Sequence, residues 1–121
     1  AFVDGGINHV NYLGQMMGLK LPVIRNASVE GGSGGPLPRE RRPWTLCGSL
    51  CTTNDVLVRQ LDRPLAPDDV LVFENIGAYS VTEAMYLFLS RAMPRVILRR
   101  GRGDYVLARD VVQTSMLNMP S

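Results

Sequence analysis

Short apolar runs separated by turn-forming residues constrain this chain more than any other feature of its sequence. Runs such as residues 71–73 (LVF) and 96–98 (VIL) are rich in β-branched and aromatic residues. These side chains fit the pleated surface of a sheet, so the runs are typical of β-strands. We expect strands at residues 1–6, 20–25, 44–49, 55–61, 70–76, 95–100 and 104–111. Seven short strands in 121 residues predict a mainly β fold, a Greek-key-like β-barrel with one or two short helices.

Two segments depart from this pattern and predict helical structure. Residues 8–17 fit a turn or a short helix, and residues 81–89 carry apolar side chains at helical spacing. Ser80 is placed to cap the second helix, and Glu83 three residues later completes a capping box. The longest expected loop, residues 28–43, is rich in Gly and Pro and joins two strands.

Composition restricts the class of protein. Apolar residues make up 45% of the chain and charged residues 20%, which is the composition of a folded domain. The net charge of +2 is small and the basic residues are spread along the chain, so nucleic-acid binding is not expected. No apolar run approaches the roughly 18 residues of a membrane span, so no membrane partner is expected. The chain begins on a strand-like run without Met, so we expect residues 1–121 to be a fragment of a longer polypeptide.

The two cysteines, Cys47 and Cys51, lie at and just after an expected strand. A secreted scaffold would carry more cysteines, so we expect reduced thiols and a cytoplasmic protein. A structural zinc site needs about four ligands, and His9 is the one other soft ligand in the chain, so no metal is expected. A nucleophilic role would need His9 beside Cys51 as a base. A thiol that lends a proton and a merely buried cysteine both remain open from the residues alone.

Two further motifs lie at the ends of expected strands. Gly5 and Gly6 follow Asp4, and they allow either a sharp turn or a close approach of the backbone to a ligand. Tyr79 lies just before the second expected helix, where its phenol could donate a hydrogen bond to a phosphate oxygen. A simple turn, and a tyrosine at the rim of the barrel, explain the same residues without a ligand.

Taken in order along the chain, these motifs resemble one family. The run DGG at residues 4–6, the stretch GSLCTTND at 48–55 and the run ENIGAY at 74–79 stand in the order of the family's own motifs. They are similar to the C-terminal β domain of the pyridoxal-phosphate-dependent amino-acid decarboxylases, the group of diaminopimelate decarboxylase and ornithine decarboxylase. The resemblance extends over residues 2–107.

The resemblance implies one part of a two-domain enzyme. An N-terminal (β/α)8 domain, absent from this chain, would hold pyridoxal 5'-phosphate through a Schiff-base lysine, and residues 1–121 would form the C-terminal β-barrel domain. This domain would complete the active site of a second subunit in a homodimer, and alone it would be inactive. Cys51 would be the catalytic thiol that reprotonates the substrate, and Tyr79 would bind the cofactor phosphate and border the substrate. Asp55 would lie in the dimer interface. Residues 4–6 would belong to the strand and turn between the two domains and would have a structural role and not a chemical one.

The residue after Cys51 bears on the substrate. The family places Glu or Asp there to meet the distal amino group of a diamino acid, whereas this chain has Thr52 as its substrate-binding candidate. Glu83 could provide the missing acid. The resemblance implies decarboxylation of meso-diaminopimelate to L-lysine in lysine biosynthesis. The alternatives are a different substrate (an ornithine-like diamino acid, a carboxylated polyamine or a carrier-bound amino acid) and, from another class, a non-catalytic β-barrel interaction module.

Overall fold

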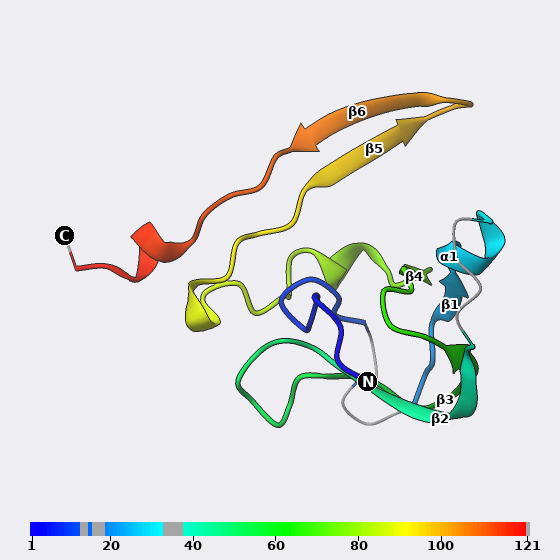
Figure 1. Cartoon of the computed structure of the whole chain (residues 1–121). Helices are drawn as coiled ribbons and strands as arrows, with labels where there is room; N and C mark the ends of the chain where they lie inside the picture. Colours follow the sequence, from blue (N-terminus) through cyan, green and yellow to red (C-terminus); the bar gives the residue numbers. More distant parts are fainter. Residues whose placement is uncertain (13–14, 16–18, 33–37, 121) are drawn as a thin grey trace.

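The computed structural model describes residues 1–12, 15, 19–32 and 38–120, and it is built from antiparallel strand pairs (Figure 1). Strand β1 pairs with β4, β2 with β3, and β5 with β6. The strands are β1 Val23–Asn26, β2 Glu40–Cys47, β3 Val56–Leu65, β4 Leu71–Glu74, β5 Val96–Arg100 and β6 Asp104–Arg109. Each of them overlaps an expected apolar run, so the chain is mainly β, as its pattern predicts.

Helical structure among the described residues is limited to short segments. These are α1 Ala27–Glu30 and the 3₁₀ turns η1 Ala78–Ser80, η2 Phe88–Ser90 and η3 Ser115–Asn118. The Asn26 side chain begins α1, because it accepts hydrogen bonds from the first backbone N–H groups of the turn. None of the helices in the described part of the chain has the length and apolarity needed to cross a membrane.

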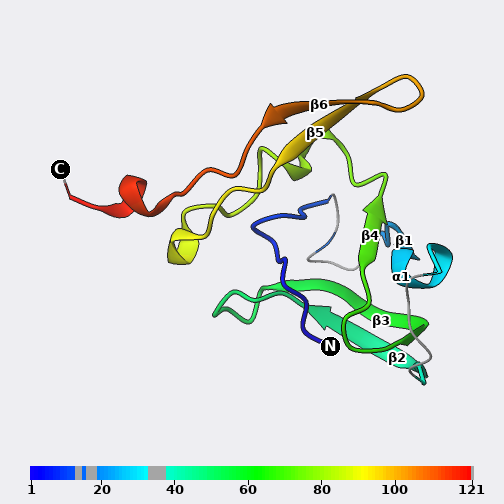
Figure 2. The same cartoon turned by 45° about the horizontal axis from the view of Figure 1, so that its top comes forward.

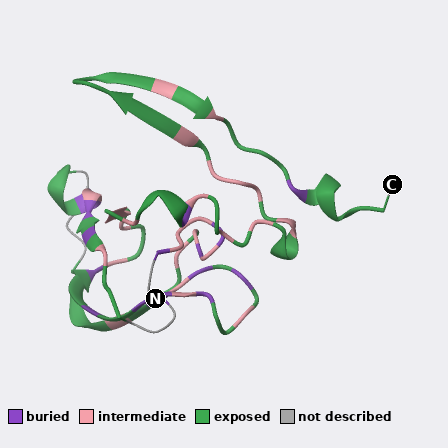
Figure 3. Ribbon diagram, turned by 180° about the vertical axis from the view of Figure 1, so that it is seen from behind, coloured by how far each residue is buried: buried purple, intermediate pink, exposed green. Residues whose placement is uncertain are grey.

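The hydrophobic core lies between the β2–β3 pair and the β1–β4 pair. Its buried members come from three strands: Ile24, Leu46, Leu57, Val58, Leu61 and Leu65. Half-buried apolar side chains from the first ten residues and from β4 pack against them. Figure 3 shows that the buried residues gather in this part of the molecule. The core therefore includes Leu46 and Leu57, on the two strands that the loop between β2 and β3 joins.

Asp69 connects three parts of this core region. Its carboxylate accepts a hydrogen bond from Asn26 Nδ2 (2.8 Å), one from the Ala66 backbone N–H (2.9 Å) and others from the Arg39 guanidinium. Burial alone would raise the pKa of Asp69, but the hydrogen bonds from Arg39, Ala66 and Asn26 outweigh it and hold that pKa below its usual value. The start of β2 and the turn between β3 and β4 are thus tied to the end of β1.

The β5–β6 hairpin lies apart from this core (Figure 2). Its apolar side chains are exposed, among them Ile97, Leu98, Tyr105 and Leu107. A two-stranded hairpin with nothing packed on either face is marginally stable in water. The hairpin therefore has apolar surface that the described residues do not cover.

The expected barrel is not observed. Every strand of a closed barrel has two hydrogen-bonded neighbours, whereas each strand described in this chain has one. Residues 1–6 contribute a single parallel bridge between Phe2 and Cys47 instead of a full strand. The described residues form three two-stranded sheets.

The prediction of a helix over residues 81–89 is wrong. The hydroxyl of Ser80 is buried and accepts the Asn11 backbone N–H, so it does not cap a helix. Leu89 and Ser90 have positive φ angles of 58° and 51°, which an α-helix does not permit. The segment is a series of turns instead.

The two remaining expectations are met only in part. Residues 7–9 form a hydrogen-bonded turn, with the His9 N–H donating to the Gly6 carbonyl, whereas residues 13–14 and 16–17 of the expected 8–17 segment lie outside the described residues. In the expected loop 28–43, residues 33–37 are likewise outside them, and β2 already begins at Glu40.

Candidate functional site

Cys51 lies at the tip of the loop between β2 and β3. The Gly48 N–H donates to the Asp55 carbonyl (2.9 Å) and closes this loop at its base. The thiol of Cys51 is free and its residue is exposed, whereas Cys47 is half-buried at the end of β2. Cys51 is therefore a surface thiol and not the buried core cysteine that composition alone allowed.

Asp55 lies behind this loop with its carboxylate turned inward. The residue is 2% exposed, and its two oxygens accept the backbone N–H groups of Ile7 (2.8 Å) and Leu50 (2.7 Å). Gly6 and Gly48 run so close to this carboxylate that a Cβ on either would lie under 3 Å from it. Gly6 is therefore packed against Asp55, and the Asp55 side chain points into its own chain instead of toward an open surface.

Two segments outside the loop are also hydrogen-bonded to it at Ser49. The Ser49 hydroxyl donates to the Asp4 carbonyl (3.0 Å), and Arg91 Nη2 donates to the Ser49 carbonyl (2.9 Å). Segments before β1 and after β4 are therefore both attached to the loop that carries Cys51.

Thr52, the substrate-binding candidate, is half-buried beside Cys51. Its Oγ1 accepts the Asn54 N–H at 3.3 Å, which leaves the hydroxyl hydrogen available to a ligand. His9 contacts Asn8 and Gly5 and not the thiol, so it is not placed as a base for Cys51. Among the described residues no three His, Cys, Asp or Glu side chains lie together in a way that could hold a metal ion.

Tyr79 projects from the second candidate segment. It is 72% exposed, and its phenol forms no hydrogen bond with a described residue. Gly77 precedes it with φ at 89°, a backbone conformation that favours glycine, and this turns the chain outward at Ala78. Because η1 is a single 3₁₀ turn, the expected attraction of phosphate to a helix N-terminus does not apply, and the phenol alone is the possible phosphate donor.

Residues 7–11 connect the Cys51 loop with the Tyr79 segment. Ile7 donates its N–H to Asp55, and its carbonyl accepts the N–H of Met85 (3.2 Å). Asn11 donates its backbone N–H to the Ser80 hydroxyl (3.0 Å) and its side-chain amide to the Glu83 carbonyl (3.0 Å). The sequence offered no signal for these contacts, because they join segments about 70 residues apart.

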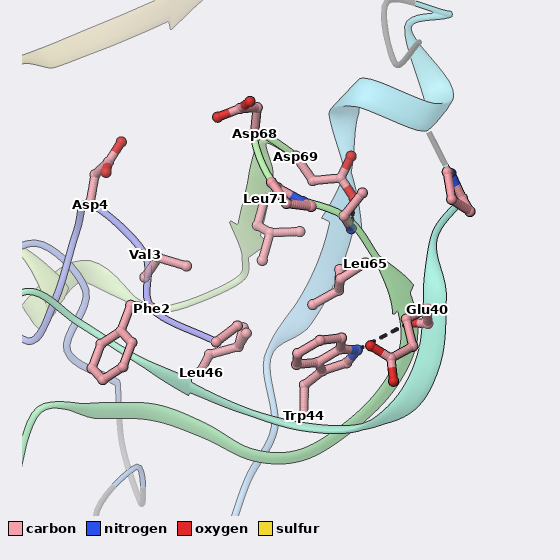
Figure 4. Close-up of a pocket in the computed structure, with 14 residues that line it drawn as sticks. Phe2, Val3, Asp4, Glu40, Trp44, Leu46, Leu65, Asp68, Asp69 and Leu71 are labelled. Atoms are coloured by element: carbon pink, nitrogen blue, oxygen red, sulfur yellow. Dashed lines mark hydrogen bonds between the residues drawn. The ribbon is translucent and has the colours of Figure 1, made fainter. Parts of the chain in front are cut away.

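A cavity of about 630 Å³ lies on another side of the core (Figure 4). Phe2, Trp44, Leu65 and Leu71 form its apolar walls, and Asp68 lies at its edge. Cys51, Thr52 and Tyr79 do not line it. Cys51 and Tyr79 are exposed, and this cavity is separate from them and from the half-buried Thr52.

Comparison with known proteins identifies the domain. Residues 1–77 match the family model described as the pyridoxal-dependent decarboxylase C-terminal sheet domain, a stretch that includes Cys51 and ends two residues before Tyr79. The chain is 33% identical over 124 residues to the L-glutamyl-(BtrI acyl-carrier protein) decarboxylase of Niallia circulans, covering 94% of this chain and 28% of that protein.

Solved structures agree in fold. A crystal structure of diaminopimelate decarboxylase superposes with a TM-score of 0.72 at 23% identity, over 96% of this chain and 28% of that one. The Helicobacter pylori diaminopimelate decarboxylase complexed with L-lysine gives 0.70 at 22% identity, over 96% of this chain and 26% of that one. This chain thus spans little more than a quarter of the length of these relatives. The family resemblance of the sequence motifs is confirmed: the chain belongs to the pyridoxal-dependent decarboxylases, as their C-terminal sheet domain.

Proposed function

We propose that this domain serves a pyridoxal-phosphate-dependent amino-acid decarboxylase, in which Cys51 is the proton donor to the substrate. The observation that carries the proposal is the exposed free thiol on a loop held at several points, within the stretch that matches the family. Bound pyridoxal phosphate supplies the electron sink for loss of carbon dioxide. The lysine that binds it would come from an N-terminal (β/α)8 domain outside this chain.

The proposed step at Cys51 is a single proton transfer. The substrate carbon that has lost carbon dioxide takes the thiol hydrogen, and the electron pair of the S–H bond stays on sulfur. The resulting thiolate regains a proton from water. The protein's contribution is to present the sulfur to one face of that carbon.

Tyr79 is proposed to donate its phenol hydrogen to a phosphate oxygen of the cofactor and to border the substrate. Its exposure and the lack of a described partner for its hydroxyl support this role. Because Cys51 and Tyr79 both project outward, we propose that they complete the active site of a second subunit in a homodimer.

Two observations favour a carrier-bound amino acid as the substrate. The 33% identical relative is named for a glutamyl group on an acyl-carrier protein. Thr52 has a hydroxyl where a diamino acid would call for a carboxylate. An acyl link consumes one carboxyl group of the amino acid, so the distal end carries no charge and a neutral residue 52 suits it.

Meso-diaminopimelate is the second candidate. The likeness in fold to diaminopimelate decarboxylases supports it, and the exposed Glu83 is the acid that could meet its distal ammonium group. In that case Glu83→Gln should raise the KM for meso-diaminopimelate, whereas it should not affect a carrier-bound substrate.

The test is release of carbon dioxide by the full-length enzyme with pyridoxal phosphate. The panel comprises meso-diaminopimelate, L-ornithine, free L-glutamate and L-glutamate in thioester linkage to a carrier protein. We expect the carrier-bound amino acid to give the highest kcat/KM. Preference for meso-diaminopimelate would overturn that choice of substrate, and no release from any amino acid would favour a non-catalytic module.

Cys51→Ala in the full-length enzyme tests the proton donor itself. We expect the variant to fold and to release carbon dioxide, but to form less than one amine product per carbon dioxide. A proton that reached the cofactor carbon instead of the substrate carbon would leave the amino group on the cofactor, and hydrolysis would release the substrate as a carbonyl compound. Cys47→Ala is the matched control, since that cysteine is half-buried and belongs to β2. An amine yield in Cys51→Ala equal to that of the wild type would remove the assigned role.

A further inference from the structure

We propose that Asp55 is a positioning residue that fixes Cys51 relative to Tyr79 through its buried carboxylate. This inference rests on the proposed roles of Cys51 and Tyr79 and adds a residue that acts through them. With 2% of its surface exposed, Asp55 has no access to a substrate, so its effect must pass through the backbone it binds.

Asp55 holds the chain on both sides of Cys51. The residue before the thiol, Leu50, donates its N–H to Asp55 Oδ2, and the residue after it, Thr52, accepts the Asp55 N–H at its carbonyl (3.2 Å). Both sequence neighbours of Cys51 are therefore hydrogen-bonded to one buried residue. This restricts the backbone from which the thiol projects.

The second carboxylate oxygen carries the restraint to the other candidate segment. Asp55 Oδ1 accepts the N–H of Ile7, and the Ile7 carbonyl accepts the N–H of Met85 in the turns that follow Tyr79. Asn11, four residues beyond Ile7, binds Ser80, the residue next to Tyr79. The carboxylate is thus hydrogen-bonded to the Cys51 loop through Leu50 and connected to the turns after Tyr79 through Ile7.

A carboxylate suits this position better than an amide of the same shape. It presents two acceptor oxygens to two N–H donors, whereas asparagine presents one acceptor and one NH2 group that would face a second donor. The close approach of Gly6 and Gly48 leaves no room for the side chain to turn away. Asp55→Asn therefore leaves one backbone N–H of the pair without an acceptor.

The experiment compares Asp55→Asn with Asp62→Asn in the full-length enzyme, in wild-type and Cys51→Ala backgrounds. Asp62 is an exposed carboxylate on β3 whose pairing with Arg41 is at the surface, so it is the matched control. The readout is the fraction of carbon dioxide released without amine product, measured at a temperature where calorimetry shows each variant folded. A purely stabilising role would not move this ratio.

We expect Asp55→Asn to displace the Cys51 thiol by about 1 Å and so to slow proton transfer from it by about 10- to 100-fold. The fraction of carbon dioxide released without amine product, called the unmatched fraction below, should therefore rise. In the Cys51→Ala background it should add nothing further, because the thiol through which it acts is gone. Asp62→Asn should match the wild type in both backgrounds.

The outcomes separate this inference from the function it builds on. An unmatched fraction that rises in Cys51→Ala but not in Asp55→Asn overturns the role of Asp55 and leaves that of Cys51 intact. A fraction unchanged in Cys51→Ala removes the proton donor itself. An equal additional rise from Asp55→Asn with and without the thiol would also overturn the inference.

If Asp55→Asn yields no folded enzyme, Gly48→Ala decides. Its added Cβ would lie under 3 Å from both oxygens of Asp55, so it displaces the carboxylate from the loop without removing its charge. A raised fraction of carbon dioxide without amine product in this variant supports the restraint by Asp55, and an unchanged fraction overturns it.

Discussion

Replacing Gly48 by alanine tests the packing on which the Cys51 loop depends. A Cβ at this position would clash with Oδ2 of Asp55 and with Cα of Gly6, at under 3 Å from each. Neither glycine has a positive φ angle, so the added methyl group introduces a clash and no backbone strain of its own. The loop and the first segment of the chain must move apart to accept it.

The magnitude follows from the bonds that this movement breaks. Leu50 and Ile7 both donate to the Asp55 carboxylate. A hydrogen bond to a charged group contributes about 1.5–3 kcal/mol, so the loss of both costs about 3–6 kcal/mol. Removing a glycine restores about 0.4–1 kcal/mol through the unfolded chain. The net cost of about 2–5.6 kcal/mol corresponds to opening of the loop that is about 30- to 10,000-fold more frequent.

Hydrogen exchange of the full-length protein, followed by mass spectrometry over residues 48–56, measures this opening. Gly5→Ala is the control, because a Cβ there would meet the movable His9 side chain at 3.3 Å. We expect faster exchange in Gly48→Ala alone. A rise below about threefold, equivalent to less than about 0.7 kcal/mol, would refute the argument that the two glycines and Asp55 are packed as described.

Three further outcomes are expected from substitutions in the full-length protein. Tyr79→Phe should weaken retention of pyridoxal phosphate by about 10- to 100-fold through loss of one hydrogen bond to a charged group, measured by equilibrium dialysis, whereas Tyr105→Phe on β6 should not. Asp69→Asn removes a carboxylate whose pKa is lowered in the folded state, so its ionised form stabilises the fold. That stabilisation is fully present above about pH 4 and is lost as the pH falls through the pKa of Asp69 in the folded protein. The difference in unfolding temperature between wild type and Asp69→Asn should therefore shrink from pH 7 toward acid, and a constant difference would contradict the assignment. Leu46→Ala should cost about 2–5 kcal/mol by calorimetry because the side chain is fully buried, against little change for the exposed Val29→Ala.

The strands were predictable because their signal is local. The runs around β4 and β5 contain apolar and β-branched residues and are followed by turn residues. Each run therefore predicts a strand without information from the rest of the chain. Register and pairing were not predictable from the sequence. They depend on partners far along the chain, such as β1 with β4, which are about 48 residues apart.

The segment after Tyr79 shows how a local pattern fails. Its apolar spacing favours a helix, but Ser80 is drawn inward to Asn11 and the chain reverses at Leu89. These tertiary contacts outweigh the weak helical preference of nine residues. The candidate site shows the same contrast between features that a local motif predicts and features that depend on distant residues. Cys51 and Tyr79 could be selected from motifs, whereas the inward orientation of Asp55 required the positions of Ile7 and Leu50.

Directed protonation requires both a fixed donor and the exclusion of water. Cys51 meets the first requirement in this chain, since its two neighbours are held by a buried residue. It does not meet the second, because the thiol and Tyr79 are both exposed. Solvent that reached the substrate carbon would protonate either face and make the position of the sulfur irrelevant. The proposed reaction therefore needs a second surface to cover the loop from outside. That surface must not displace the thiol when it packs on the loop. The hydrogen bonds between Asp55 and the residues on either side of Cys51 would keep the loop in place when a second surface packs against it.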